Sequence, residues 1–145
     1  MIFKKALAVA VCLFIFSSYS SAGPLISGLT VYDTVNASDW SIQSGLQTGT
    51  ALYGDRAHIL SSIPPAYTGA EWIRTAADSL DYTPYIIAAV DAPEDVMLFA
   101  VLDERASNVP DWLSEWTDTG DNLTAVNGTD EQVFSIYKKY FPAGS

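Results

Sequence analysis

The sequence predicts an all-β fold, an antiparallel β-sandwich or barrel. After residue 22, short runs rich in β-branched and aromatic residues alternate with clusters of Gly, Pro, Asn, Asp and Ser, the pattern of short strands joined by turns. No helix-period pattern of useful length occurs in that region. No repeat, low-complexity tract or linker divides it, so we expect residues 23–145 to form one domain.

Residues 1–22 predict a secretory signal peptide. Lys4 and Lys5 precede an apolar run at residues 6–16, and small residues occupy the −3 and −1 positions of a site after Ala22. The apolar run is shorter than the roughly 20 residues that span a bilayer. We therefore expect cleavage after Ala22 and a secreted or periplasmic product.

The expected mature chain is cysteine-free and strongly acidic. Removing residues 1–22 removes Cys12 and two of the seven basic residues, leaving five basic and 17 acidic residues, a net charge of −12. This charge repels phosphates, so it argues against nucleic-acid partners and anionic membrane surfaces. Solubility outside the cell is the simplest explanation of the acidity, and a calcium site or a cationic partner is the alternative.

The first half of the domain predicts four short strands. Its apolar residues alternate with polar ones, and turn residues such as Asn36 and Pro64 end the runs. Trp72 and Arg74 fall on one strand face, so we expect the Arg74 guanidinium to be partly buried and paired with Asp78 or Asp103. The four strands are expected at residues 28–33, 40–46, 57–63 and 70–76.

The two most apolar strands are expected at residues 85–90 and 96–102. Both are apolar on both faces, which predicts strands at the centre of a sheet. The connector at residues 91–95 contains Pro93 and predicts a tight hairpin.

The last third of the chain predicts two loops and a final strand. Residues 107–118 are expected to form a loop with one helical turn at Asp111–Glu115, and residues 119–130, which contain Gly120 and Gly128, a second loop. Residues 133–141 alternate again and predict the last strand.

The sequence gives little support for catalysis, so we assign no catalytic residue. His58 is the single histidine and lies between apolar neighbours without a nucleophile motif. No zinc-ligand spacing or phosphate-binding glycine loop occurs. Carboxylates are so frequent that neighbouring pairs carry no selective signal for glycoside hydrolysis.

Calcium is the metal that the loops would suit. Asp118, Asp121 and Asn122 offer oxygen ligands around Gly120, although the spacing of an EF-hand is absent. The segment at residues 78–81 is a second candidate. The alternative for both is that these side chains stabilise turns through hydrogen bonds to the backbone.

Two tryptophans provide the strongest functional signal. Trp112 and Trp116 lie in a polar loop where no strand pattern requires a large ring. Such rings can stack on the apolar faces of sugars, while neighbouring polar groups bind the hydroxyls. The polar contacts expected here are Asp103, Arg105 and Asp118. The alternative is that one or both rings close the end of the sandwich. Trp40 and Trp72 lie on strand faces and are expected in the core.

Four stretches together resemble a known kind of module. They are SIPPAYTGAEWIRTAADS at 62–79, DER at 103–105, VPDWLSEWTDTGDNL at 109–123 and FSIYKKYFPAGS at 134–145. The chain resembles the non-catalytic β-sandwich accessory modules of secreted bacterial polysaccharide-degrading enzymes. The resemblance implies a jelly-roll or galactose-binding-like sandwich and a carbohydrate-binding role, but supplies no ligand residues. It also implies a further strand after the Phe-Pro-Ala-Gly motif, whose absence could leave strand 133–141 as an open edge.

The sequence thus predicts an exported, non-catalytic protein that binds a polysaccharide or cell-surface glycan. One alternative is an assembly protein that pairs with a protein partner through an open edge at 133–141. A second alternative is a small polysaccharide lyase or hydrolase using carboxylates that the sequence does not single out.

Overall fold

The computed structural model describes residues 2–4, 11–17, 23–106 and 109–145. Within these ranges the chain is built from strands and short 3-10 turns, so the prediction of an all-β antiparallel fold is confirmed. None of the helical turns in this part of the chain has the length and apolarity that a membrane crossing requires.

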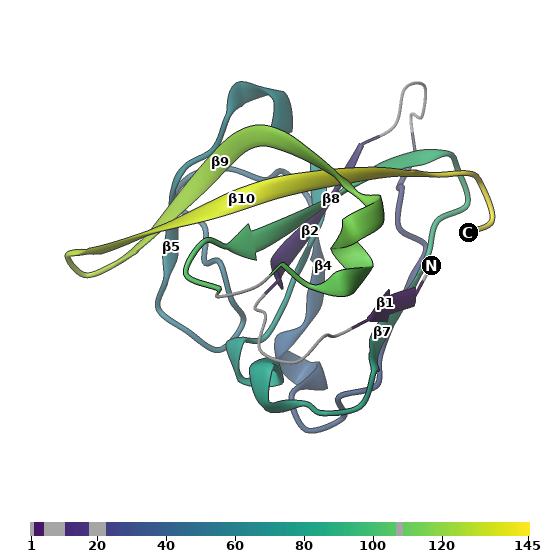
Figure 1. The fold of residues 1–145 in the computed structure, drawn as a ribbon, viewed down its shortest axis with the longest axis horizontal. Coiled ribbons are helices and arrows are strands. Elements are labelled where there is room, and N and C mark those ends of the chain that lie inside the picture. Colours follow the sequence, from purple (N-terminus) through teal and green to yellow (C-terminus); the bar gives the residue numbers. More distant parts are fainter. Residues whose placement is uncertain (1, 5–10, 18–22, 107–108) are drawn as a thin grey trace.

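The strands form two antiparallel sheets (Figure 1). The small sheet has the order β1-β7-β3, and the large sheet has the order β4-β6-β2-β8-β10-β9-β5. The strands are β1 (Ile2–Lys4), β2 (Val11–Ser17), β3 (Gly28–Val31), β4 (Ser41–Gln43), β5 (Ile59–Ser62), β6 (Glu71–Arg74), β7 (Ile86–Asp91), β8 (Val96–Asp103), β9 (Thr117–Asn127) and β10 (Asp130–Phe141). The 3-10 turns are η1 (Ala37–Asp39), η2 (Pro65–Tyr67), η3 (Ala77–Asp81) and η4 (Asp111–Glu115).

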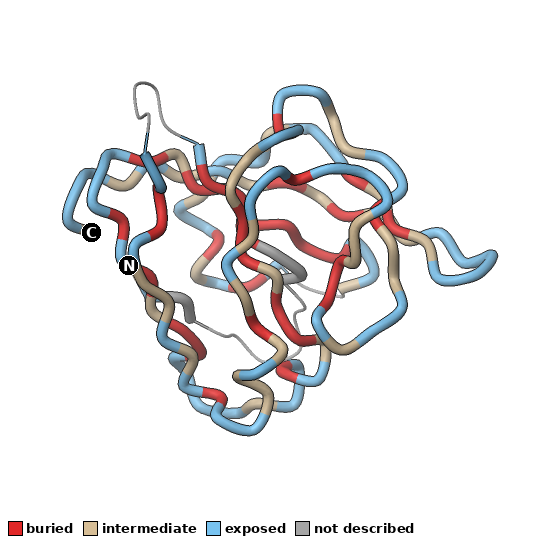
Figure 2. Tube along the Cα trace, turned by 180° about the vertical axis from the view of Figure 1, so that it is seen from behind, coloured by how far each residue is buried: buried red, intermediate tan, exposed pale blue. Residues whose placement is uncertain are grey.

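Two hydrophobic clusters lie on opposite faces of the large sheet. The first fills the space between the sheets and includes Val90 of β7 and Leu98 of β8. The second lies on the other face and includes Trp72 of β6 and Phe134 of β10. Figure 2 shows the buried segments running through the middle of the molecule and the exposed tip of the β9–β10 hairpin projecting beyond it. Because strand side chains alternate between faces, each central strand contributes to both clusters.

The predicted hairpin at residues 85–102 is wrong. β7 lies in the small sheet between β1 and β3, whereas β8 lies in the large sheet between β2 and β10. The connector crosses from one sheet to the other and buries Ala92, which is 2% exposed. The prediction that both strands are central in their sheets is confirmed, because each has a neighbour on either side.

The predicted loop at 119–130 is also wrong, because most of it belongs to β9. β9 pairs with β10 from Asn127 to Thr117 and buries Leu123 and Ala125. This pairing also removes the expected open edge at 133–141, because β10 is hydrogen-bonded to β8 on its other side.

Two strands come from the predicted signal peptide. β1 pairs with β7, and β2 lies in the interior of the large sheet between β6 and β8. The predicted cleavage site after Ala22 lies outside the described residues, so cleavage stays a prediction.

The predicted positions of Trp40 and Trp72 in the core are confirmed, since both are buried. The indole N–H of Trp40 donates to Ser79 Oγ at 2.9 Å, and the Ser79 hydroxyl donates to buried Asp33 at 2.8 Å. The predicted acidic partners of Arg74 are wrong. Its Nε donates to the Ala51 carbonyl at 3.0 Å, its guanidinium lies 5.2 Å from the Trp72 ring centroid, and Asp78 pairs instead with Arg56. Burial lowers the pKa of Arg74 from its usual value.

Candidate functional site

The turn η4 positions both loop tryptophans, and its predicted bounds at Asp111–Glu115 are confirmed. Pro110 begins the turn with its restricted φ, and the Leu113 amide donates to the Pro110 carbonyl at 2.9 Å. Leu113 points into the core and is 1% exposed. This anchor leaves Trp112 and Trp116 half-buried against the first cluster, with part of each ring at the surface.

The aromatic rings contact one another in sequence. The Trp112 and Trp116 ring centroids lie 5.6 Å apart with an interplanar angle of 79°, and those of Trp116 and Phe141 lie 5.9 Å apart at 61°. These are edge-to-face contacts, a favoured geometry for aromatic pairs. The two tryptophans therefore form a corner and not a flat platform.

These rings line a hollow of about 410 Å³, here called the tryptophan hollow. Lys139 donates to Glu115 Oε2 at 2.7 Å and lies 5.8 Å from the Phe141 ring centroid. Aromatic surface and charged groups of both signs thus face one space. The hollow is lined by Ile2, Tyr85, Asp111, Trp112, Ser114, Glu115, Trp116, Lys139 and Phe141.

Three predicted polar contacts lie outside the lining of this hollow. Asp103 is 6% exposed and accepts from Arg105 through Nε at 3.0 Å and Nη2 at 2.6 Å. Asp103 pairs with Phe134, seven residues before Phe141 on β10, which is about 23 Å along a strand. Asp118 follows Trp116 by two residues and accepts from the Gly120 amide at 2.9 Å.

The residues predicted to bind calcium lie on a strand. Asp118, Asp121 and Asn122 are exposed residues of β9, and Asp121 accepts from the Tyr67 hydroxyl at 2.7 Å. In the part of the chain that the structure describes, no three His, Cys, Asp or Glu side chains gather as metal ligands. Calcium binding stays a prediction.

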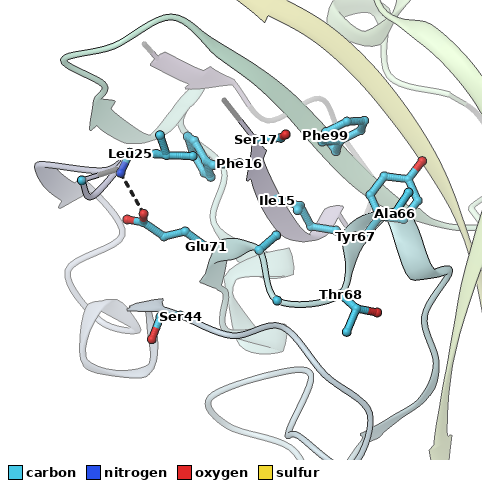
Figure 3. A pocket seen from close by; sticks show the side chains of 13 residues that line it. Ile15, Phe16, Ser17, Leu25, Ser44, Ala66, Tyr67, Thr68, Glu71 and Phe99 are labelled. Carbon is cyan, nitrogen blue, oxygen red and sulfur yellow. Dashed lines mark hydrogen bonds between the residues drawn. The ribbon is translucent and has the colours of Figure 1, made fainter. Parts of the chain in front are cut away.

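A second hollow of about 550 Å³ lies beside the end of β2 (Figure 3). Ile15, Phe16 and Ser17 form part of its lining. The Glu71 carboxylate accepts from the Leu25 and Ile26 amides at 2.8 and 3.0 Å. The lining also includes Tyr67, whose pKa is raised to about 12 by burial and by its bond to Asp121.

His58 lies just before β5 and not within a strand, and it is half-buried. Its ring lies edge-on to Tyr53 at 5.6 Å, and Nε2 lies 3.2 Å from the Gln132 amide nitrogen. Nδ1 is buried with no hydrogen-bond partner among the described residues.

Most lining residues of the tryptophan hollow were not predicted, and several of them come from outside the tryptophan loop and its neighbouring turn. Tyr85 precedes β7, and Lys139 and Phe141 belong to the end of β10. The alternation of the last strand places Lys139 and Phe141 on one face, which was the available signal. Nothing in the sequence indicates that this face lies against η4.

Comparisons with protein-family models, curated proteins and solved structures find no match.

Proposed function

We propose that this protein is a non-catalytic glycan-binding protein whose site is the tryptophan hollow. The observation that carries the proposal is that Trp112, Trp116, Tyr85 and Phe141 line one hollow together with charged Glu115 and Lys139. Aromatic walls with a few polar groups are the usual composition of a small-molecule site. Aromatic faces match the C–H faces of sugar rings, and the charged groups match their hydroxyls.

The corner geometry favours a short contact with the glycan. Rings at 79° to one another cannot both stack on the same sugar face. We therefore expect one sugar ring, or the end of a chain, to enter the corner. The charge favours a neutral glycan, because Asp111 and Glu115 outnumber Lys139 at the hollow and the domain is acidic.

Replacement of Trp116 tests the proposal. We expect Trp116→Ala to weaken binding to a retained neutral polysaccharide by at least about 10-fold, since central aromatic contacts typically contribute about 2 kcal/mol or more. Affinity electrophoresis against a panel of neutral and uronic-acid polysaccharides measures the retardation. Tyr32→Ala is the matched control, because Tyr32 is an aromatic residue that is 50% exposed outside the hollow.

A second variant separates lost binding from lost folding. Ser114 is an exposed residue of the lining, so Ser114→Trp should fill the hollow without removing core contacts. We expect it to abolish retardation while the thermal transition stays unchanged. Retardation that survives in both Trp116→Ala and Ser114→Trp would contradict this site.

A further inference from the structure

β2 occupies an interior position of the large sheet. It pairs antiparallel with β6 on one side and with β8 on the other. Ile15, for example, lies opposite Trp72 and Phe99. An interior strand satisfies the backbone hydrogen-bonding groups of both neighbours, so its removal would create two strand edges inside the sheet.

The side chains of β2 belong to both hydrophobic clusters. Phe14 and Phe16 pack in the cluster between the sheets, and Ile15 packs in the cluster on the other face. Their exposed fractions are 3%, 1% and 0%. The space that β2 fills therefore requires three consecutive large apolar side chains on an extended backbone.

The same residues are the last three of the apolar run of the predicted signal peptide, residues 6–16. Cleavage after Ala22 would separate β2 from the rest of the sheet, leaving an opening between β6 and β8, here called the strand slot. Adjacent strands lie about 4.8 Å apart, so β6 would have to move by about that distance to pair with β8 directly. β6 is held in place by Trp72 and Ile73, which are buried in opposite clusters.

We propose that the strand slot accepts an apolar strand from a partner protein once residues 1–22 have been removed. The partner segment is extended, runs antiparallel to β8, and places large apolar side chains where Phe14, Ile15 and Phe16 lie. This is β-strand addition, in which backbone bonds supply affinity and side-chain pockets supply specificity.

The neighbours of the slot define the partner's side chains. Phe14 lies opposite Ala100 on β8, and this small residue leaves room for a large ring. Ser17 is exposed beside the hollow in Figure 3, so one end of the slot is open to solvent. We therefore expect polar residues to be tolerated at this end and excluded at the position of Ile15.

The test starts from the full chain with a site-specific protease sequence inserted between Ser17 and Gly23. After folding, the chain is cut at that site, and the fragment of residues 1–17 is removed by gel filtration in mild denaturant. The remaining protein is mixed with a fluorescent peptide of residues 11–17, made with C12S and terminal lysines for solubility. We expect the cut protein to bind the peptide in fluorescence anisotropy. We expect the uncut protein to bind at least about 100-fold more weakly, because its own strand competes at a high effective concentration.

Two peptide variants provide the controls without altering the protein. Ile15→Asp should reduce binding at least about 100-fold, because it would bury a carboxylate at the centre of the slot. Ser17→Asp should bind as well as the parent peptide. Equal binding of the Ile15→Asp peptide would overturn the proposal.

Three other results would also overturn it. One is a cut protein that stays folded but takes up no peptide, with β6 and β8 amides protected from hydrogen exchange as in a closed sheet. A second is a cut protein that unfolds and is not restored by the peptide. The third is a dimer after cutting, detected by light scattering, because the slot would then be filled by a second copy and not by a partner protein.

Discussion

The Tyr67 hydroxyl connects η2 to strand β9 through its hydrogen bond to the exposed Asp121. Burial and this bond raise the tyrosine pKa to about 12 from an ordinary value of 10.0. A raised pKa means that the folded state favours the protonated form. The resulting stability is fully present below pH 10 and is lost as the pH rises from 10 to about 12.

We therefore expect the ionisation of Tyr67 to lower the free energy of unfolding by about 2 kcal/mol between pH 9.5 and pH 12. Tyr67→Phe should lack this part of the loss, because it cannot ionise. Urea unfolding of both proteins at the two pH values measures the difference and cancels the contribution of the other tyrosines. Identical pH dependence in the two proteins would show that Tyr67 titrates normally.

At the scale of elements, periodicity predicted the strands whose own residues favour β-structure. The alternation of apolar and polar residues predicted β6 and β10. Runs that are apolar on both strand faces predicted β7 and β8. β9 was missed because Gly120, Asn122 and Asn127 are typical turn residues. Pairing along β10 and the burial of Leu123 and Ala125 outweigh these local preferences.

The candidate site was predictable only in part for a related reason. Trp112 and Trp116 were identifiable because no strand pattern required them. Tyr85 precedes a strand of the small sheet and Lys139 lies on a strand of the large sheet, so they reach the same hollow through the packing of the two sheets. Sequence periodicity does not specify which strands become neighbours. The wrong prediction of a hairpin at residues 85–102 has the same cause. Consecutive strands usually pair, but β7 and β8 lie in different sheets.

Gly120 lies in β9, at an irregularity in the hydrogen-bond ladder between β9 and β10. Gly120 has a φ of +76°, and the β9–β10 register shifts nearby, between Ser135 and Tyr137. Thr119 Oγ1 donates to the Ile136 carbonyl at 2.7 Å and accepts from the Asp121 amide at 3.1 Å. This geometry is that of a bulge at which glycine avoids the backbone strain that a residue with a Cβ usually carries.

We expect Gly120→Ala to lower the free energy of unfolding by about 1 kcal/mol, the cost of a left-handed conformation for a residue with a Cβ. The cost arises from the backbone, because an added Cβ at Gly120 meets no atom within 4 Å. Gly23→Ala is the control, since its Cβ is equally free of contacts and its φ lies outside the left-handed region. Urea denaturation of both variants measures the costs, and equal costs would exclude backbone strain at Gly120.

For the whole molecule, the stability of the fold depends on β2, a strand that belongs to the predicted signal peptide. Burying a large apolar side chain stabilises a protein by about 1.5–3 kcal/mol, so Phe14, Ile15 and Phe16 together contribute about 5–9 kcal/mol. The total stability of a domain is typically about 5–15 kcal/mol. A chain that loses these residues therefore needs a replacement strand to keep a comparable stability.

We expect deletion of residues 1–17 to lower the free energy of unfolding by several kcal/mol or to abolish the cooperative transition. Deletion of residues 1–4 is the control, because it removes only the short β1, whose Ile2 is 55% exposed. Its cost should stay below about 2 kcal/mol, the contribution of a partly buried side chain. Urea unfolding monitored by tryptophan fluorescence compares both deletions with the full chain. If deletion of residues 1–17 costs no more than deletion of residues 1–4, the large sheet closes without β2 and needs no strand from elsewhere.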